Sequence, residues 1–142
     1  MLLALGLVTA APPSRPDALL QPVAQLAADD YSVVKAARDS RQFRALELSN
    51  GIRLVLVSDA KAEMAGASLD VHVGSYSDPG DLPGLAHFCE HMLFLGTSGF
   101  PEEGDFERYV AAAGGGNNAY TDSEETCYYF DVSAGALPAL AL

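Results

Sequence analysis

Three side chains suited to metal and acid–base chemistry lie within the five-residue segment His87-Phe88-Cys89-Glu90-His91. An α-helix turns by about 100° per residue, so with His87 at zero, Glu90 lies at about −60° and His91 at about +40°. All three would therefore share one face of a helix. Two histidines four residues apart can bind one Zn²⁺, and a carboxylate beside them can deprotonate the metal's water. The segment predicts a hydrolytic zinc site with ligands His87 and His91 and general base Glu90.

The plain structural alternative for this segment is a set of buried polar groups satisfied by hydrogen bonds, or a partial structural metal site. Burying three titratable groups on one helix face without a metal would cost several kcal/mol in desolvation, so the hydrolytic interpretation is favoured. His72 and Asp70, on one predicted strand face, are weaker candidates for completing the site. A lone histidine on a polar strand face is more often solvated or hydrogen-bonded.

The other side chains of the same helix are largely apolar. Leu85, Cys89 and Met92 project to the side opposite the histidines, and this side is expected to pack into the core. Phe94 returns to the face of the site, one to two turns further on. It is a candidate for lining a substrate pocket, and core packing is its alternative.

Strands are predicted before this helix. Residues Phe43–Leu48 and Ile52–Ser58 are β-prone runs around Ser49-Asn50-Gly51, which suits the positive φ angles of a tight hairpin turn. Residues Ala67–Val73 alternate apolar and polar side chains with period two, which predicts a third strand.

Helices and further strands follow. An apolar helix is predicted over Leu85–Leu95, ended by Gly96, and a second helix from about Pro101 to the glycines at 114–116. Two strands are predicted over Asn118–Thr121 and Thr126–Ser133, joined by a turn at Asp122–Glu125. Another helix is predicted to begin in Leu137–Leu142. The expected fold class is α+β, with a mostly antiparallel sheet and helices packed on one side.

Composition limits the partners. Of 142 residues, 49% are hydrophobic and 19% charged, which is typical of an ordinary globular domain. The formal net charge is −11 and only eight Lys and Arg are present, so nucleic acid is not an expected partner. The acidic balance is compatible with cationic or polypeptide substrates, but a soluble surface is the favoured explanation and identifies no substrate.

Residues 1–28 are expected to be an apolar leader and linker, and the folded part is expected to begin near Asp29. Met1–Ala11 is too short to span a bilayer and ends in a small-x-small pattern, as a secretory signal does, although a basic start is missing. We therefore expect export to the periplasm or the extracellular space, with the cytoplasm as the alternative. No other segment is expected to cross a membrane, and the two cysteines define no disulfide framework.

The zinc segment has the inverted H-x-x-E-H order, and around it the sequence resembles the insulysin and pitrilysin family of metallopeptidases. The resemblance extends from about Tyr31 to the end of the chain. The blocks that carry it are Leu46-Glu47-Leu48-Ser49-Asn50-Gly51, Leu69-Asp70-Val71-His72-Val73-Gly74-Ser75, Gly84-Leu85-Ala86-His87, His91-Met92-Leu93-Phe94-Leu95-Gly96-Thr97, Asn118-Ala119-Tyr120-Thr121 and Tyr128-Tyr129-Phe130-Asp131-Val132-Ser133.

The resemblance implies a zinc-dependent metalloendopeptidase that hydrolyses peptides and small proteins, with a fold like that of the mitochondrial processing peptidase. It implies that His87 and His91 bind Zn²⁺, Glu90 activates the metal's water, Asn118 and Ala119 lie on an edge strand that pairs with substrate, and Phe94 borders a side-chain pocket. A third ligand, a glutamate, is implied roughly 75–80 residues beyond the motif glutamate, past Leu142. Residues 29–142 would then be the N-terminal portion of a peptidase domain that is completed by the remainder of a parent chain.

Two other functions stay open. A non-catalytic scaffold subunit of the same family would usually lose motif residues, whereas His87, Glu90 and His91 are all present. An S-ribosylhomocysteine lyase places a similar motif on a related fold, but the match over Asn118–Ser133 speaks against it.

Overall fold

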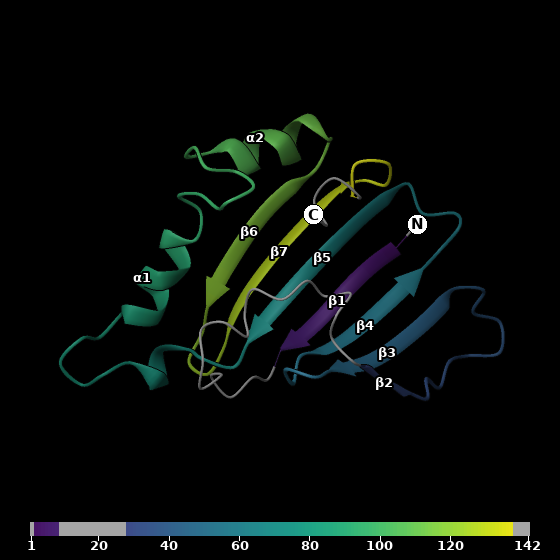
Figure 1. The fold of residues 1–142 in the computed structure, drawn as a ribbon, viewed down its shortest axis with the longest axis horizontal. Helices are drawn as coiled ribbons and strands as arrows, with labels where there is room; N and C mark the ends of the chain where they lie inside the picture. Colours follow the sequence, from purple (N-terminus) through teal and green to yellow (C-terminus); the bar gives the residue numbers. More distant parts are fainter. Residues whose placement is uncertain (1, 9–27, 138–142) are drawn as a thin grey trace.

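The computed structural model describes residues 2–8 and 28–137, and it shows an α+β fold built on one seven-stranded sheet (Figure 1). The strands are β1 (Leu2–Val8), β2 (Ala28–Tyr31), β3 (Gln42–Leu48), β4 (Arg53–Ser58), β5 (Met64–Val71), β6 (Gly116–Thr121) and β7 (Thr126–Ser133). The helices are the 3₁₀ turn η3 (Ser75–Ser77), α1 (Leu85–Met92) and α2 (Asp105–Ala112). The sheet order is β2-β3-β4-β1-β5-β7-β6, and every pairing is antiparallel except that of β1 with β5. The expected fold class is confirmed.

The predicted hairpin is β3 with β4. Phe43 pairs with Val57 and Leu46 with Leu54, and the turn closes through a hydrogen bond from the N–H of Gly51 to the carbonyl of Leu48. Gly51 has a φ of 86°, which glycine adopts without steric cost. Asn50 does not share the positive φ expected of an Asn-Gly pair; its side-chain oxygen accepts the N–H of Ile52 instead.

The first part of the N-terminal apolar run is a strand of the sheet. Leu2–Val8 is the strand β1, which lies between β4 and β5 in the middle of the sheet (Figure 1). The interpretation as a signal peptide therefore has no support in the fold. Residues 9–27 of the predicted leader and linker lie outside the described residues. Of the helix predicted over Leu137–Leu142, the structure describes only Leu137.

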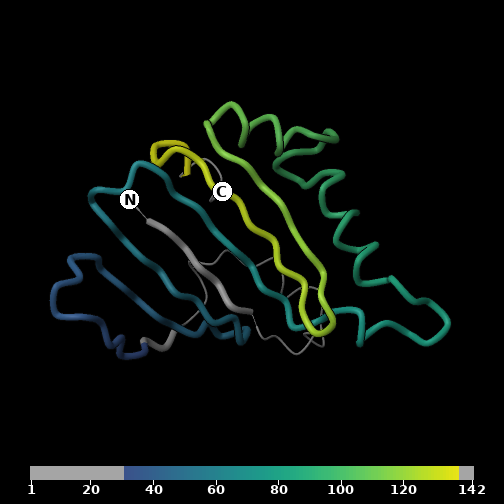
Figure 2. Tube along the Cα trace, turned by 180° about the vertical axis from the view of Figure 1, so that it is seen from behind, coloured from purple at the N-terminus to yellow at the C-terminus, as the bar shows by residue number. Residues whose placement is uncertain are grey.

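Both helices lie along β6, at one side of the sheet, and both also contact β7 (Figures 1 and 2). The helix α1 begins at Leu85 as predicted but ends earlier, at Met92. The prediction that the second helix begins at Pro101 was wrong, because Gly104 adopts the left-handed conformation (φ 77°) and α2 begins only after it. No helix in the described ranges is long and apolar enough to cross a membrane.

The largest fully buried side chains belong to α2 and β7. Val110 of α2 and Val132 of β7 are fully buried, and Phe106 packs edge-to-face on both Phe100 and Phe130 with ring centroids 5.5 and 5.8 Å away. Such contacts stabilise aromatic pairs beyond the area that they bury. This cluster attaches the segment that follows α1 to the sheet and so helps to define where α1 lies.

Candidate metal centre

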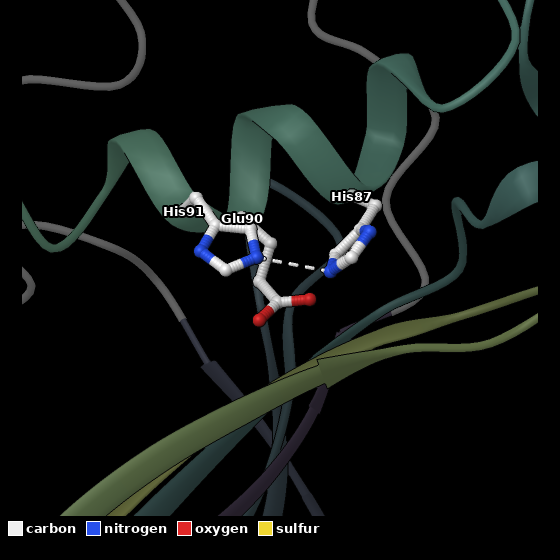
Figure 3. Close-up of side chains that lie close together, drawn as sticks. All are labelled: His87, Glu90 and His91. Atoms are coloured by element: carbon white, nitrogen blue, oxygen red, sulfur yellow. Dashed lines mark hydrogen bonds between the residues drawn. The ribbon is translucent and has the colours of Figure 1, made fainter.

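The two histidines of α1 point toward one common position. The Nε2 atoms of His87 and His91 lie 3.0 Å apart, and their ring centroids are separated by 4.7 Å (Figure 3). The potential ligand atoms of His87, Glu90 and His91 all lie within 4.8 Å of one another. The side-by-side placement expected from the helical projection is therefore present.

The donor set fits zinc. Two Zn–N bonds of roughly 2.0–2.1 Å at a tetrahedral angle place the two nitrogens about 3.3 Å apart, close to the observed spacing. Both imidazoles are exposed, which leaves the outer side of the site open to solvent and to further ligands. The two histidines could therefore hold a zinc ion through Nε2 with little rearrangement.

Glu90 differs from the histidines because it is buried, with 6% of its surface exposed. Its carboxylate points from α1 toward the sheet (Figure 3) and accepts a hydrogen bond from the hydroxyl of Thr121 on β6, at 2.6 Å between Oγ1 and Oε2. Charged groups are rarely buried without a partner, because desolvation of the carboxylate is costly. The Thr121 hydroxyl compensates one of its two oxygens.

The N-terminus of α1 is held by a carboxylate that the sequence analysis did not single out. Asp78 lies in the turn before the helix, and its two oxygens accept the backbone N–H groups of Gly84, at 2.6 Å, and Ala86, at 2.9 Å. The first N–H groups of a helix lack partners within it, and a negative charge there also complements the helix dipole. Asp78 lies six and eight residues before the N–H groups that it binds. Sequence patterns for helix caps cover only the residues next to the helix, so they do not identify Asp78 as a cap.

The turn between β6 and β7 is attached to the segment that leads into α1. The N–H groups of Ser75 and Tyr76 donate to the carbonyls of Asp122 and Ser123, at 2.9 and 2.8 Å. Gly74 is buried against the same turn. The end of the strand that carries Thr121 is therefore tied to the segment that leads into the helix that carries Glu90.

A cavity of about 250 Å³ is lined by residues of β5, β6 and β7 and by residues between Leu93 and Phe106, in the segment after α1. Phe94 and Asn118, both predicted to contact substrate, line it. Its wall is mainly aromatic and aliphatic, with Leu69, Leu93, Phe94, Phe100, Phe106, Tyr128, Tyr129 and Phe130. Ala119 is half-buried on β6 opposite Tyr128 and is not among the lining residues.

Asp70 and His72 do not join the metal centre. Asp70 pairs with Cys127, and the side chains of these two residues share one face of the sheet. The neighbouring pair, Leu69 and Tyr128, lies on the other face of the sheet. Tyr128 lies near Cys89 and Glu90 of α1, so α1 covers the face opposite to that of Asp70. Burial raises the pKa of Tyr128, and the nearby Cys89 and Glu90 add to this effect. His72 follows the end of β5 and is exposed. In the described part of the chain, the group of potential ligands contains His87, Glu90 and His91 only.

The expectation that the other side of α1 packs into the core was wrong. Leu85 and Met92 are 43% and 44% exposed, and Cys89 is also exposed. The buried position of α1 is Glu90, because the helix turns its carboxylate toward β6. The projection gave the correct angles between side chains but not the direction in which the sheet lies.

Comparison with known proteins gives consistent matches of three kinds: a family model, curated relatives and a solved structure. The family model described as Insulinase (Peptidase family M16) matches residues 53–141. The insulin-degrading enzyme of Mus musculus is 52% identical over 101 residues, which is 71% of this chain and 10% of that protein, and the A-factor-processing enzyme of Saccharomyces cerevisiae is 48% identical over 100 residues, with shares of 70% and 10%. A crystal structure of pitrilysin superposes with a TM-score of 0.72 and 36% identity, covering 80% of this chain and 12% of that one. The chain thus spans about a tenth of the length of these curated relatives.

Proposed function

Because the chain belongs to the insulinase family, peptidase family M16, we propose that it carries the zinc-binding and proton-transferring residues of a metalloendopeptidase that hydrolyses peptides and small proteins. The observation that supports this most directly is the convergence of three groups on one helix. Two imidazole Nε2 atoms lie 3.0 Å apart beside a buried carboxylate. These side chains offer two imidazole ligands and a general base, which hydrolytic zinc chemistry uses together with a third protein ligand.

Each residue has a distinct role in this proposal. His87 and His91 hold the zinc ion through Nε2, and the ion, when bound, acts as a Lewis acid that makes a water molecule easier to deprotonate. Glu90 accepts the proton of the attacking water and delivers it to the leaving amine. We further propose that a glutamate beyond Leu142 supplies the third ligand and that residues 29–142 belong to the N-terminal portion of the peptidase domain.

Substrate binding is proposed along β6. This strand ends the described sheet, with β7 as its one neighbour in the strand order, and it lies beside α1. A peptide added to such an edge gains main-chain hydrogen bonds whatever its sequence, which favours broad specificity. The N–H of Ala119 donates to the side-chain oxygen of Asn118 at 2.9 Å, and we propose that a substrate carbonyl replaces this oxygen.

The cavity lined by Phe94 and Asn118 is proposed to take one substrate side chain. Its walls are mostly apolar, so an aromatic or large aliphatic side chain would bury more surface there than a polar one. Phe94 would form one wall of the pocket that selects a residue next to the scissile bond.

Hydrolysis of a quenched fluorescent peptide by the zinc-loaded protein in its full natural length tests the proposal. Turnover should stop on chelation, return with Zn²⁺, and be abolished by Glu90→Gln without loss of zinc. Cleavage that a chelator leaves unchanged would exclude zinc hydrolysis. Bound zinc without any turnover would instead favour a non-catalytic member of the family.

A further inference from the structure

A row of hydroxyl groups connects Glu90 to the backbone of the sheet. The Thr121 hydroxyl donates to Glu90 Oε2 at 2.6 Å, and Thr126 Oγ1 lies 3.4 Å from Thr121 Oγ1. The Thr126 hydroxyl donates in turn to the carbonyl of Val73 at 2.8 Å. Glu90 and Thr126 are the two buried polar residues in the described ranges, each with 6% exposure. Thr121, which lies between them, therefore connects the buried polar groups of this region.

The number of hydrogen bonds that the Thr121 hydroxyl can donate limits how it restrains the Glu90 carboxylate. A threonine hydroxyl has one proton, so its hydrogen bond to Oε2 can restrain only one oxygen of Glu90. The second oxygen keeps its lone pairs available beside the two imidazoles. Restraint of one oxygen also restricts rotation of the carboxylate about its terminal bond, which is otherwise a broad torsion.

Thr121 is itself well placed to act as a restraint. It pairs directly with Thr126 at the end of the β6–β7 hairpin, where the N–H of Asp122 donates to the carbonyl of Glu125 at 2.8 Å. The same turn accepts the N–H groups of Ser75 and Tyr76. A threonine has few rotamers because its β-carbon is branched, so its hydroxyl direction follows from this backbone.

We infer that Thr121 is the positioning residue of Glu90: its hydroxyl holds one carboxylate oxygen so that the other faces the position between His87 and His91. This inference rests on the proposed function, in which Glu90 is the proton acceptor. Thr121 acts through Glu90 and does not contact the reacting atoms. Loss of a hydrogen-bond partner behind a functional group typically costs 10–100-fold in activity, and displacement of such a group by about 1 Å can cost a similar factor.

Thr121→Val removes the hydroxyl with little change in shape, whereas Thr121→Ser keeps the hydroxyl and removes the methyl group. In the zinc-loaded protein we expect Thr121→Val to lower kcat about 10–100-fold with KM and zinc content nearly unchanged, and Thr121→Ser to stay close to the parent. The kcat of Glu90→Gln gives the rate that remains when the proton acceptor is absent. If Thr121→Val does not fold, Thr121→Ala removes the hydroxyl without adding an apolar group that must be accommodated.

A second readout does not depend on turnover. Crystal structures, or NMR relaxation of the ¹³C-labelled Glu90 side chain, should show one carboxylate orientation in the parent and in Thr121→Ser, and several in Thr121→Val. An unchanged Glu90 orientation with parental kcat in Thr121→Val would overturn the inference. Equal losses in Thr121→Val and Thr121→Ser would overturn it as well, because the methyl group would then be responsible.

The two readouts separate this inference from the proposed function. Should the parent and Glu90→Gln both be inactive with zinc bound, the proposed function fails, while the orientation of Glu90 in Thr121→Val still decides whether Thr121 positions it. An active parent with an inactive Glu90→Gln and an unaffected Thr121→Val would leave the proposed function standing and remove only the inference.

Discussion

Gly74 packs directly on Asp122: a Cβ atom at residue 74 would lie 2.3 Å from the carbonyl oxygen of Asp122. The backbone nitrogens of Glu124 and Glu125 would lie 2.7 and 2.6 Å from the same position. The backbone of Gly74 is extended and any residue could adopt it, so the requirement for glycine here comes from space alone. This contact holds the β6–β7 turn against the segment that leads into α1.

Gly74→Ala should therefore destabilise the protein by about 1–3 kcal/mol, as overpacking against rigid backbone generally does. Equilibrium urea unfolding measures the change. Gly80→Ala is the matched control, because a Cβ atom at residue 80 would have nothing within 4 Å and the free energy of unfolding should hardly change. Equal stability of the two variants would show that the turn and the segment after β5 are not in contact.

Asp78→Ala should shorten or fray α1. It removes both acceptors of the Gly84 and Ala86 N–H groups, and loss of a helix cap costs about 0.5–2 kcal/mol. Asp78→Asn should lie between the parent and the alanine variant, because an amide offers one accepting oxygen and no charge. Circular dichroism and urea unfolding report the two effects. Asp81→Ala, at an exposed position of the same loop, should leave both signals near the parent values.

The 142-residue chain should hold zinc loosely. Catalytic zinc is normally bound by three protein ligands, and here His87 and His91 provide the two imidazoles while Thr121 already binds one oxygen of Glu90. After dialysis against trace zinc and then metal-free buffer, we expect well under one zinc per chain by atomic emission. Glu90→Gln should give the same content and His91→Ala still less. Stoichiometric zinc after dialysis would contradict the prediction, and a loss of zinc in Glu90→Gln would make Glu90 a ligand.

The Tyr120 hydroxyl should lose its proton at a higher pH than an ordinary tyrosine does. The pKa of Tyr120 is raised from 10.0 to about 12, chiefly by the hydrogen bond from its hydroxyl to Glu125, at 3.2 Å, with further contributions from Cys127, the charge of Glu125 and burial. A raised folded pKa means that the stabilisation is fully present below about pH 10 and is lost as the pH rises toward 12. Glu125→Gln should lower this pKa toward the ordinary value and reduce the loss of stability in that window. Absorbance titration at 295 nm, compared with that of Tyr120→Phe, would reveal an unshifted Tyr120 if the hydrogen bond is not formed.

The sequence predicted best those features that depend on neighbouring residues. The relative angles of His87, Glu90 and His91 follow from helical geometry alone, and the β3–β4 hairpin follows from its turn residues. The helix face that meets the sheet was not predictable in the same way, since it depends on where β6 lies. The apolar side of α1 was therefore expected to be buried, but the buried residue of this helix is Glu90.

Two kinds of feature were missed: contacts between residues far apart in the sequence, and elements whose local signals conflict. Thr121 lies 31 residues after Glu90, so only the folded sheet brings the two together. The start of α2 was misplaced because Pro101 suits a first helical turn, while the left-handed Gly104 stops the helix from beginning there. The apolar run at the N-terminus has the composition of either a leader or a buried strand, and periodicity does not separate the two.

The central position of β1 has a consequence for the order of folding. β3 with β4, and β6 with β7, are joined by short turns and can pair early, whereas Leu7 of β1 must find Arg53, and Leu5 must find Ser68. Closing such long loops costs chain entropy before any contact forms, which slows folding. The β3–β4 and β6–β7 hairpins should therefore form first, and the long-range pairings that β1 and β5 make should follow. Substitutions in Leu2–Val8 should accordingly speed unfolding more than they slow folding.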